Sequence, residues 1–486
     1  MTVGQELNIG MTFGRVAKAN PNHEAIIAAD ITLTFGKLWR IVRGFATRMR
    51  ELGIDRSSTV AVHSRDMIAC VASMLAASLL GARYVSLEAR LVGDGVVVPT
   101  HILRSPEVSP FRDLTYHVMD ASWPQAAPHD QESSEFPGYD DADDPWWVVH
   151  TSGTTGKPKY LNLSQRAVYG RSMAVQADFK PLRTRVCSLF PCNTRPFIAR
   201  ANAALLNACT IIDTIDIAFM QAKGVNLVYG APRTAIEWLA SRVILPKISV
   251  IQVSGAKLSD VDAAVLLQSF NTVEDVYGSS ETSKSFVNIK ALSQGRVVTR
   301  GQNLDSEVQI IGIDGTLCNT PGLEGTVRIR NGYMASAYIA DSHATAKSFR
   351  NGWFYPGDQG WWGPAGELII GGRLDEVINL GGAKVDPNAV DEVLCSVRGI
   401  TGAASFRDPG DVIPPRLMAM VSVSDPAESD KCVAAAHLAC RERLAAFMVP
   451  QVIFVVPAIP MTGDGAPRRT ECQRLAQALI KKVNQL

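Results

Sequence analysis

The sequence predicts an α/β protein with parallel sheets and more than one domain. Residues 59–62 and 84–87 are short apolar runs typical of buried strands, and the apolar segment 67–80 has the length of a helix. A strand, a helix and a second strand in this order form a βαβ unit, which favours a parallel sheet. The chain has 486 residues, more than one compact core usually serves.

The same alternation continues on both sides of this unit. Thr34 is a candidate N-cap for a helix whose apolar residues recur at helical spacing, and Gly53 suits the end of that helix. We expect strands at 146–149, 205–212, 225–229, 248–253 and 367–370, a hairpin region at 322–330 and a helix from Pro232. The Pro-, Ser- and acid-rich residues 121–145 indicate an exposed linker, and Gly371-Gly372 indicates a break.

After Arg373 the pattern changes to that of a small α+β unit. We expect helices at 388–397 and 431–446, and strands at 417–423 and 452–456. The predicted domains are therefore 1–374 and 375–486.

Composition excludes several classes of protein. The formal net charge is +1 with no long block of one sign, which gives no support to a nucleic-acid partner. The longest apolar segment, residues 68–82, is too short to span a bilayer, so we expect no membrane insertion. The nine cysteines include no C-x-x-C pair, and residues 1–20 lack a signal-peptide pattern, so reduced thiols and a cytoplasmic location are expected.

A phosphate-binding loop is predicted at Thr151-Ser-Gly-Thr-Thr-Gly-Lys-Pro-Lys159, directly after an apolar run. Glycines let backbone amides approach an anion, hydroxyls donate further hydrogen bonds, and lysine adds charge. The Walker A pattern does not fit, because Pro158 follows Lys157 where a hydroxyl residue for magnesium is required.

This loop resembles the signature of the adenylate-forming superfamily, which includes acyl- and aryl-CoA synthetases, adenylation domains and luciferases. Three further segments resemble the same superfamily in the same order: Tyr277-Gly-Ser-Ser-Glu-Thr282, Gly352-Trp-Phe-Tyr-Pro-Gly-Asp358 and Gly372-Arg-Leu-Asp-Glu-Val-Ile-Asn-Leu-Gly-Gly-Ala-Lys384. The resemblance implies a large N-terminal α/β region of several subdomains with a β-barrel-like part, and a small mobile C-terminal domain.

The resemblance also implies the reaction and its cofactors. ATP and Mg²⁺ would convert a small carboxylic acid into an acyl-adenylate, and coenzyme A, or the phosphopantetheine of an acyl carrier protein, would then form a thioester. Glu281 would hold Mg²⁺ and Thr282 would bond the α-phosphate. The residues implied in ATP or AMP binding are Thr151, Ser152, Gly153, Thr154, Thr155, Gly156, Lys157, Tyr277, Gly278, Thr282, Asp358 and Arg373.

The C-terminal domain would supply the remaining roles. By resemblance, Asp375 is the hinge, and Gly381 and Gly382 line the channel for the thiol. The chain departs from the pattern at Ala466, where relatives carry a catalytic lysine. Three explanations stay open: an engineered lysine-to-alanine change, a natural site that uses Lys384, Arg468 or Arg469 instead, or a relative that does not adenylate.

The acyl site is the least specific part of the resemblance. It implies a lining that includes Asn193, Tyr229, Ser254, Gly255 and Ala256. Candidates to meet a polar group or second carboxylate of the acid are Arg195, Arg200, Arg233 and Lys257. The leading interpretation is an acyl- or aryl-CoA ligase. A stand-alone enzyme that loads a carrier protein and a nucleotide-binding pseudoenzyme are the alternatives.

Overall fold

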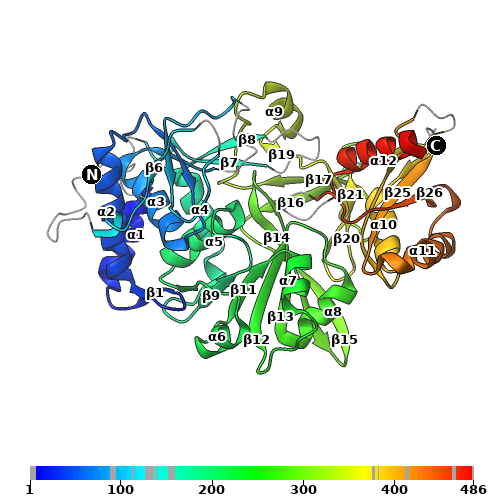
Figure 1. The fold of residues 1–486 in the computed structure, drawn as a ribbon, viewed down its shortest axis with the longest axis horizontal. Coiled ribbons are helices and arrows are strands. Elements are labelled where there is room, and N and C mark those ends of the chain that lie inside the picture. The colour runs from blue at the N-terminus through cyan, green and yellow to red at the C-terminus, as the bar shows by residue number, and fades with distance from the viewer. Residues whose placement is uncertain are drawn as a thin grey trace. The chain divides into compact units, whose positions relative to one another are not determined.

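The structure is a computed structural model in which the chain forms two compact units (Figure 1). It describes residues 7–87, 95–111, 114–125, 136, 138, 141–151, 159–374, 378–380, 383–410, 415–461 and 467–483, with the backbone alone at 383–384 and 482–483. Unit 1 consists of Met1–Thr151, Lys159–Val308 and Ile329–Phe354, and unit 2 of Ser152–Pro158, Gln309–Arg328 and Tyr355–Leu486.

The first sheet of unit 1 contains the predicted βαβ unit. Helix α3 (Met67–Leu80) joins β3 (Thr59–His63) to β4 (Arg83–Ser86), and the two strands are parallel. Asp66 caps the helix, because its side chain accepts a hydrogen bond from the amide of Ala69. The sheet has the order β6-β5-β3-β4-β7-β8, with β5 His101–Arg104, β6 His117–Val118, β7 Pro145–His150 and the antiparallel edge strand β8 Tyr160–Ser164.

The second sheet of unit 1 has nine strands in the order β15-β14-β13-β12-β11-β9-β10-β1-β2. Its parallel strands are β1 Glu24–Ile27, β10 Thr210–Ile212, β9 Arg185–Ser188, β11 Leu227–Gly230, β12 Ile248–Ser254 and β13 Phe270–Ser279. Antiparallel strands at its two edges are β2 Thr32–Thr34, β14 Ser283–Ser293 and β15 Arg296–Asn303. Figure 1 shows β12, β13 and β14 side by side.

Helices cover both faces of this nine-stranded sheet. One core cluster joins residues of both sheets to α1 (Ile9–Ala19), α2 (Phe35–Glu51), α3, α4 (Gln165–Ala174) and α5 (Arg195–Leu206). A second cluster packs α6 (Ile217–Ala222), α7 (Pro232–Leu239) and α8 (Asp260–Ser269) on the opposite face. Because strands buried on both faces lack a polar face, their continuous apolar runs predict them well.

Unit 2 contains a three-stranded sheet between helices. Strands β24 (Ile400–Arg407), β25 (Leu417–Val423) and β26 (Val452–Val455) have α10 (Pro387–Cys395) and α11 (Ser429–Arg443) on one face. Helix α12 (Arg469–Val483) packs on the other face, as Figure 1 shows. The same unit contains β20 (Asp358–Trp362), β21 (Leu368–Arg373), β22 (Ile378–Leu380) and β23 (Ala383–Val385).

The remaining elements are short. Strand β16 (Glu307–Ile311) pairs with β17 (Gly325–Arg330), which also pairs with β19 (Trp353–Phe354) and β20. Helix α9 (Ser342–Ser348) precedes β18 (Phe349–Arg350).

No helix in the described residues is long and apolar enough to cross a membrane.

Three local predictions were wrong. Within 121–145, Trp123 and Phe136 are buried, and Trp123 contacts Phe45 edge to face with ring centroids 5.2 Å apart, so this segment is not simply an exposed linker. The segment 205–212 begins as the end of α5 and becomes a strand only at Thr210. Gly371-Gly372 does not end the strand, because β21 continues to Arg373, although its register with β20 shifts at Gly371.

Candidate functional site

The predicted acyl-site residues of unit 1 gather at one edge of the nine-stranded sheet. Strands β9, β11 and β12 are parallel neighbours, so their carboxyl ends lie together. Asn193 follows β9, Tyr229 lies near the end of β11, and Ser254 ends β12, with Gly255 and Ala256 immediately after it. The carboxyl edge of a parallel sheet is where α/β proteins bind ligands.

The next strand, β13, brings Tyr277 and the Glu281–Thr282 turn to this same edge. Val276 of β13 pairs with Ser254 of β12. At Gly278 an added Cβ would lie 2.1 Å from the carbonyl oxygen of Ser283, so the register with β14 requires glycine there. The sequence therefore specifies the close hairpin that carries the turn.

Thr282 is fully buried, and hydroxyl groups surround its own. Its Oγ1 accepts a hydrogen bond of 3.0 Å from the Ser285 hydroxyl and lies 3.2 Å from the Ser279 hydroxyl. The Ser279 hydroxyl in turn accepts from the amides of Glu281 and Thr282. The turn is thus held by its own side chains.

Tyr338 contacts two of the segments that the sequence singles out. Its hydroxyl donates to Oε1 of Glu281 at 2.7 Å, and Nζ of Lys159 lies 5.0 Å from the centroid of its ring. Glu281 and Tyr338 are both buried. Sequence reasoning missed Tyr338, because no motif or spacing relates it to either partner.

Arg171 is a second functional candidate that the sequence did not reveal. From α4, its guanidinium donates to the carbonyl oxygens of Ser280 at 2.9 Å, Glu281 at 2.7 Å and Tyr333 at 3.0 Å. Burial lowers the pKa of Arg171 to about 9, and the charge of Arg195 acts in the same direction. The side chain therefore remains charged at neutral pH and fixes the backbone of the turn.

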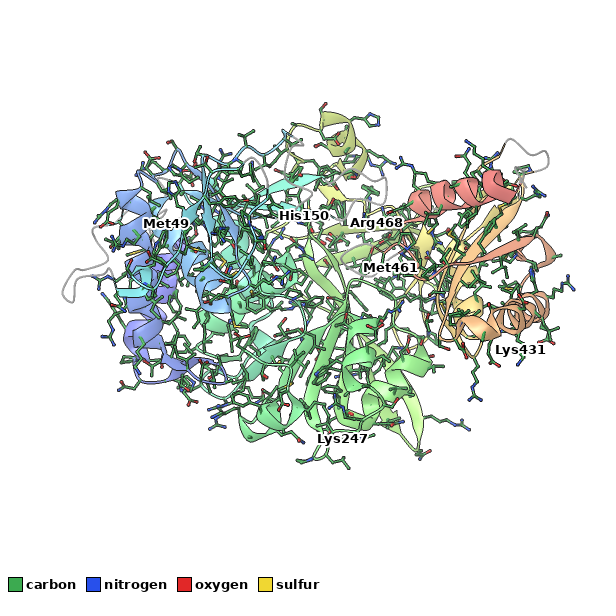
Figure 2. All side chains as sticks on the ribbon, in the orientation of Figure 1. Met49, His150, Lys247, Lys431, Met461 and Arg468 are labelled. Atoms are coloured by element: carbon green, nitrogen blue, oxygen red, sulfur yellow. The ribbon has the colours of Figure 1, made fainter. Side chains whose placement is uncertain are left out.

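The predicted phosphate loop lies largely outside the described residues. Its flanks, β7 and β8, form an antiparallel pair, and the amide of Thr151 donates to the carbonyl of Lys159 at 2.8 Å. Residues not described are Ser152, Gly153, Thr154, Thr155, Gly156 and Lys157. Figure 2 labels His150, the last residue of β7.

In unit 2, Asp358 and Arg373 face each other across β20 and β21. The two residues pair in register, and Nη1 of Arg373 lies 3.7 Å from Oδ1 of Asp358. The Asp358 side chain is largely buried at 12% exposure, whereas that of Arg373 is 34% exposed. A fixed carboxylate beside a guanidinium suits the hydroxyls and phosphate of a nucleotide.

Several predicted residues of the C-terminal domain lie outside the described part. These are Asp375, Gly381, Gly382 and Ala466, and of Lys384 only the backbone in β23 is described. Arg469 is engaged in the interior of unit 2, because it contacts Asp391 at 2.7 Å and donates to Ser405 and Asn388. Arg468, labelled in Figure 2, is exposed, and its Nη1 lies 3.8 Å from Oε2 of Glu471.

The four cationic candidates near the acyl site differ in their surroundings. Arg233 forms an exposed ion pair with Glu237 on α7. Lys257 is exposed, whereas Arg195 and Arg200 are half-buried on α5. The guanidinium carbon of Arg200 lies 5.0 Å from the ring centroid of Tyr229, whose buried hydroxyl has no hydrogen-bond partner among the described residues.

Charged side chains form a buried cluster around Lys284 of β14, next to strands β12 and β13. The Lys284 ammonium lies 2.9 Å from Asp178, in the short helix Gln176–Asp178, and 3.5 Å from Glu274. The Gln252 amide donates to both carboxylates. The ammonium of Lys284 is therefore neutralised by Asp178 and Glu274, whereas Arg200 lies over the Tyr229 ring.

The donors present fit a nucleotide with Mg²⁺. Tyr338 uses one hydrogen-bonding position of the Glu281 carboxylate, and a carboxylate accepts several partners. No group of three or more potential metal ligands occurs among the described His, Cys, Asp and Glu residues. Proteins often hold Mg²⁺ through one or two carboxylates together with substrate phosphates.

The chain is similar in sequence to known CoA ligases. A probable CoA ligase of Humulus lupulus is 26% identical over 341 residues, which cover 66% of this chain and 64% of the relative. The 4-chlorobenzoate–CoA ligase of Arthrobacter sp is 24% identical over 470 residues, 88% of this chain and 87% of the relative. The first similarity covers about two thirds of the chain, and the second covers most of it.

Similarity of fold extends over nearly the whole molecule. The o-succinylbenzoate CoA synthetase from Bacillus subtilis, solved in complex with its acyl-adenylate intermediate, has a TM-score of 0.82 at 20% identity and covers 95% of this chain and 97% of its own. This confirms the predicted α/β fold class. The AMP-binding enzyme family matches residues 13–339. The chain therefore belongs to the AMP-binding enzymes, within the adenylate-forming superfamily that its motifs resemble.

Proposed function

We propose that the chain is an acid–thiol ligase that activates a small carboxylic acid with ATP. The observation that carries the proposal is the row of residues from Asn193 to Thr282 at the carboxyl ends of four adjacent strands, β9, β11, β12 and β13. In the proposal, the candidate acid-binding residues lie beside the candidate α-phosphate-binding turn, as the transfer of an adenylyl group to a carboxylate requires.

In the first half-reaction, a carboxylate oxygen of the acid attacks the α-phosphorus of ATP. A carbon-bound oxygen becomes joined to phosphorus, and the bond to pyrophosphate breaks. Thr282 would donate to the α-phosphate, and Glu281 would hold Mg²⁺, which supplies positive charge to the phosphates. The loop 151–157 would bind the β- and γ-phosphates, Tyr277 and Gly278 would bind adenine, and Asp358 and Arg373 the ribose.

In the second half-reaction, a thiol attacks the carbonyl carbon of the acyl-adenylate and AMP leaves. The domain 375–486 would turn about Asp375, and Gly381 and Gly382 would border the path of the pantetheine arm. Coenzyme A is the proposed acceptor. A carrier-protein phosphopantetheine ends in the same arm and is the alternative that the acceptor assay decides.

The acid itself is best sought among those with a second polar group. Arg200 over the ring of Tyr229 offers a cation and a hydroxyl donor toward such a group. The catalytic step needs charge near Ala466, and Arg469 is committed to Asp391, so Lys384 and Arg468 remain the candidates for a natural substitute. A nucleotide-binding pseudoenzyme is the second candidate function, since it requires no such cation.

The deciding experiment is acid-dependent exchange of pyrophosphate into ATP, across a library of mono- and dicarboxylic acids. It is run on the chain and on Ala466→Lys. We expect exchange with the correct acid and an increase of roughly tenfold or more for Ala466→Lys, because an ammonium there stabilises the transition state. Equal rates would favour a natural substitute cation, and ATP binding without exchange in either form would favour the pseudoenzyme.

A further inference from the structure

Two cysteines far apart in sequence have their sulfurs in contact. Sγ of Cys70 lies 3.7 Å from Sγ of Cys192. Cys70 is buried in the first turns of α3, and Cys192 is half-buried in the segment between β9 and α5. Both residues are in unit 1.

Cys192 lies in an ordered turn beside the candidate acyl site. The amide and the hydroxyl of Thr194 both donate to the carbonyl of Pro191, at 3.0 and 2.7 Å. Cys192 and Asn193 are the two central residues of this turn. A covalent bond at Cys192 would therefore restrain the backbone that carries Asn193.

The two thiols differ in environment in a way that assigns an order of reaction. The Cys70 thiol donates its hydrogen to Cys192 and also lies 3.8 Å from the carbonyl of Ser64. This hydrogen bond, together with burial, raises the pKa of Cys70. Because Cys192 is only half-buried, we expect its thiol to react with an oxidant first, and the buried Cys70 to act as the resolving cysteine.

We propose that Cys70 and Cys192 are a redox modification site that forms a reversible disulfide with low-molecular-weight disulfides as oxidant. The Cys192 thiolate attacks the oxidant, forms a mixed disulfide and releases one thiol. Cys70 then loses its proton, attacks the Cys192 sulfur and releases the second thiol. Two protein thiols are oxidised and one small disulfide is reduced to two thiols.

The geometry requires little rearrangement. Bonded sulfurs lie about 2.05 Å apart, so the pair must approach by less than 2 Å, which side-chain rotation and a small turn movement can supply. The bond would tie the Pro191–Thr194 turn to α3. Its effect on acid binding rests on the proposed function: we expect kcat/KM for the acid to fall by about ten- to a hundredfold, because misplacement near the reacting group is costly.

The test uses the folded full-length chain with Cys395→Ser, which removes the exposed thiol of α10. Reduced protein is incubated with oxidised glutathione at several ratios to reduced glutathione, alkylated and digested for mass spectrometry. We expect a peptide that joins Cys70 to Cys192, lighter by two hydrogens and removed by dithiothreitol. Cys70→Ser should instead retain glutathione on Cys192, and Cys192→Ser should leave Cys70 unmodified.

Controls separate this site from general oxidation. Cys187→Ser removes another buried thiol, whose sulfur contacts the carbonyl of Thr214, and should not change the cross-link. A stable glutathione adduct on Cys192 in the otherwise unaltered pair, or oxidation of Cys70 only after unfolding, would overturn the proposal. A disulfide that forms although neither the chain nor Ala466→Lys shows acid-dependent exchange would overturn the proposed function and leave the redox site standing.

Discussion

The hydroxyl of Tyr338 donates a hydrogen bond of 2.7 Å to Oε1 of Glu281. The ring of the same tyrosine lies beneath the ammonium of Lys159, so one side chain contacts the end of the phosphate-loop motif and the proposed metal ligand. A fixed donor to a buried carboxylate helps to define its orientation, which a Mg²⁺ ligand needs.

Tyr338→Phe should weaken the response to Mg²⁺. Without the hydroxyl, Glu281 loses a charge-assisted hydrogen bond of about 1.5–3 kcal/mol, and its carboxylate is free to rotate. We expect the Mg²⁺ concentration for half-maximal pyrophosphate exchange to rise about tenfold, measured in the Ala466→Lys background. Tyr116→Phe, which loses only a bond from the amide of Phe111, is the control and should leave the Mg²⁺ curve unchanged.

Arg171→Lys should loosen the Glu281–Thr282 turn. One ammonium cannot reproduce the planar fork that serves three carbonyls on two segments. The Glu281 carbonyl keeps the amide of Ala335 as a donor, but loss of the guanidinium from the Ser280 and Tyr333 carbonyls is costly. We expect a loss of about 3 kcal/mol in the free energy of unfolding, measured with urea, and a lower kcat for exchange. Arg166→Lys on the same helix alters an exposed ion pair and should cost under about 0.5 kcal/mol. Similar losses for both variants would contradict the assigned role of Arg171.

Local signals predicted the elements but not the contacts that assemble the site. Thr34 caps α2 as predicted, because its side chain accepts from the amide of Lys37 three residues on. Glu281 and Tyr338, in contrast, are 57 residues apart, and Arg171 and Tyr333 are 162 apart. No periodicity or capping rule relates residues at such separations.

The wrong local predictions have a common physical cause. The composition of 121–145 is polar on average, but one aromatic side chain, Trp123, finds a partner in Phe45 and is buried. Likewise Gly371 lies where the register between β20 and β21 shifts, yet Gly372 pairs with Gln359 and β21 continues to Arg373. Tertiary packing overrode the local propensity in both places.

Asp275→Asn should change how stability depends on pH. Burial raises the pKa of this carboxyl from 3.8 to about 7, with Asp260 acting in the same direction and Lys290 and Lys257 opposing. Between these two values the folded chain holds a proton that the unfolded chain has released, so stability falls as pH rises through 7. We expect the free energy of unfolding, measured with urea, to fall by about 2 kcal/mol less between pH 5 and pH 8 in Asp275→Asn than in the unaltered chain. Parallel curves for the two proteins would contradict the shift.

Asp375→Pro should impair thioester formation far more than adenylation, if this residue is the hinge. Proline fixes φ near about −65° and so blocks rotation between the two half-reactions, whereas adenylation needs a single orientation. The comparison is made in the Ala466→Lys background, with pyrophosphate exchange for the first half-reaction and AMP release from a supplied acyl-adenylate with coenzyme A for the second. If Asp375 only caps or pairs locally, the Asp375→Pro protein should lose both activities together and have a lower melting temperature. That result would remove the support for a mobile domain beginning at residue 375.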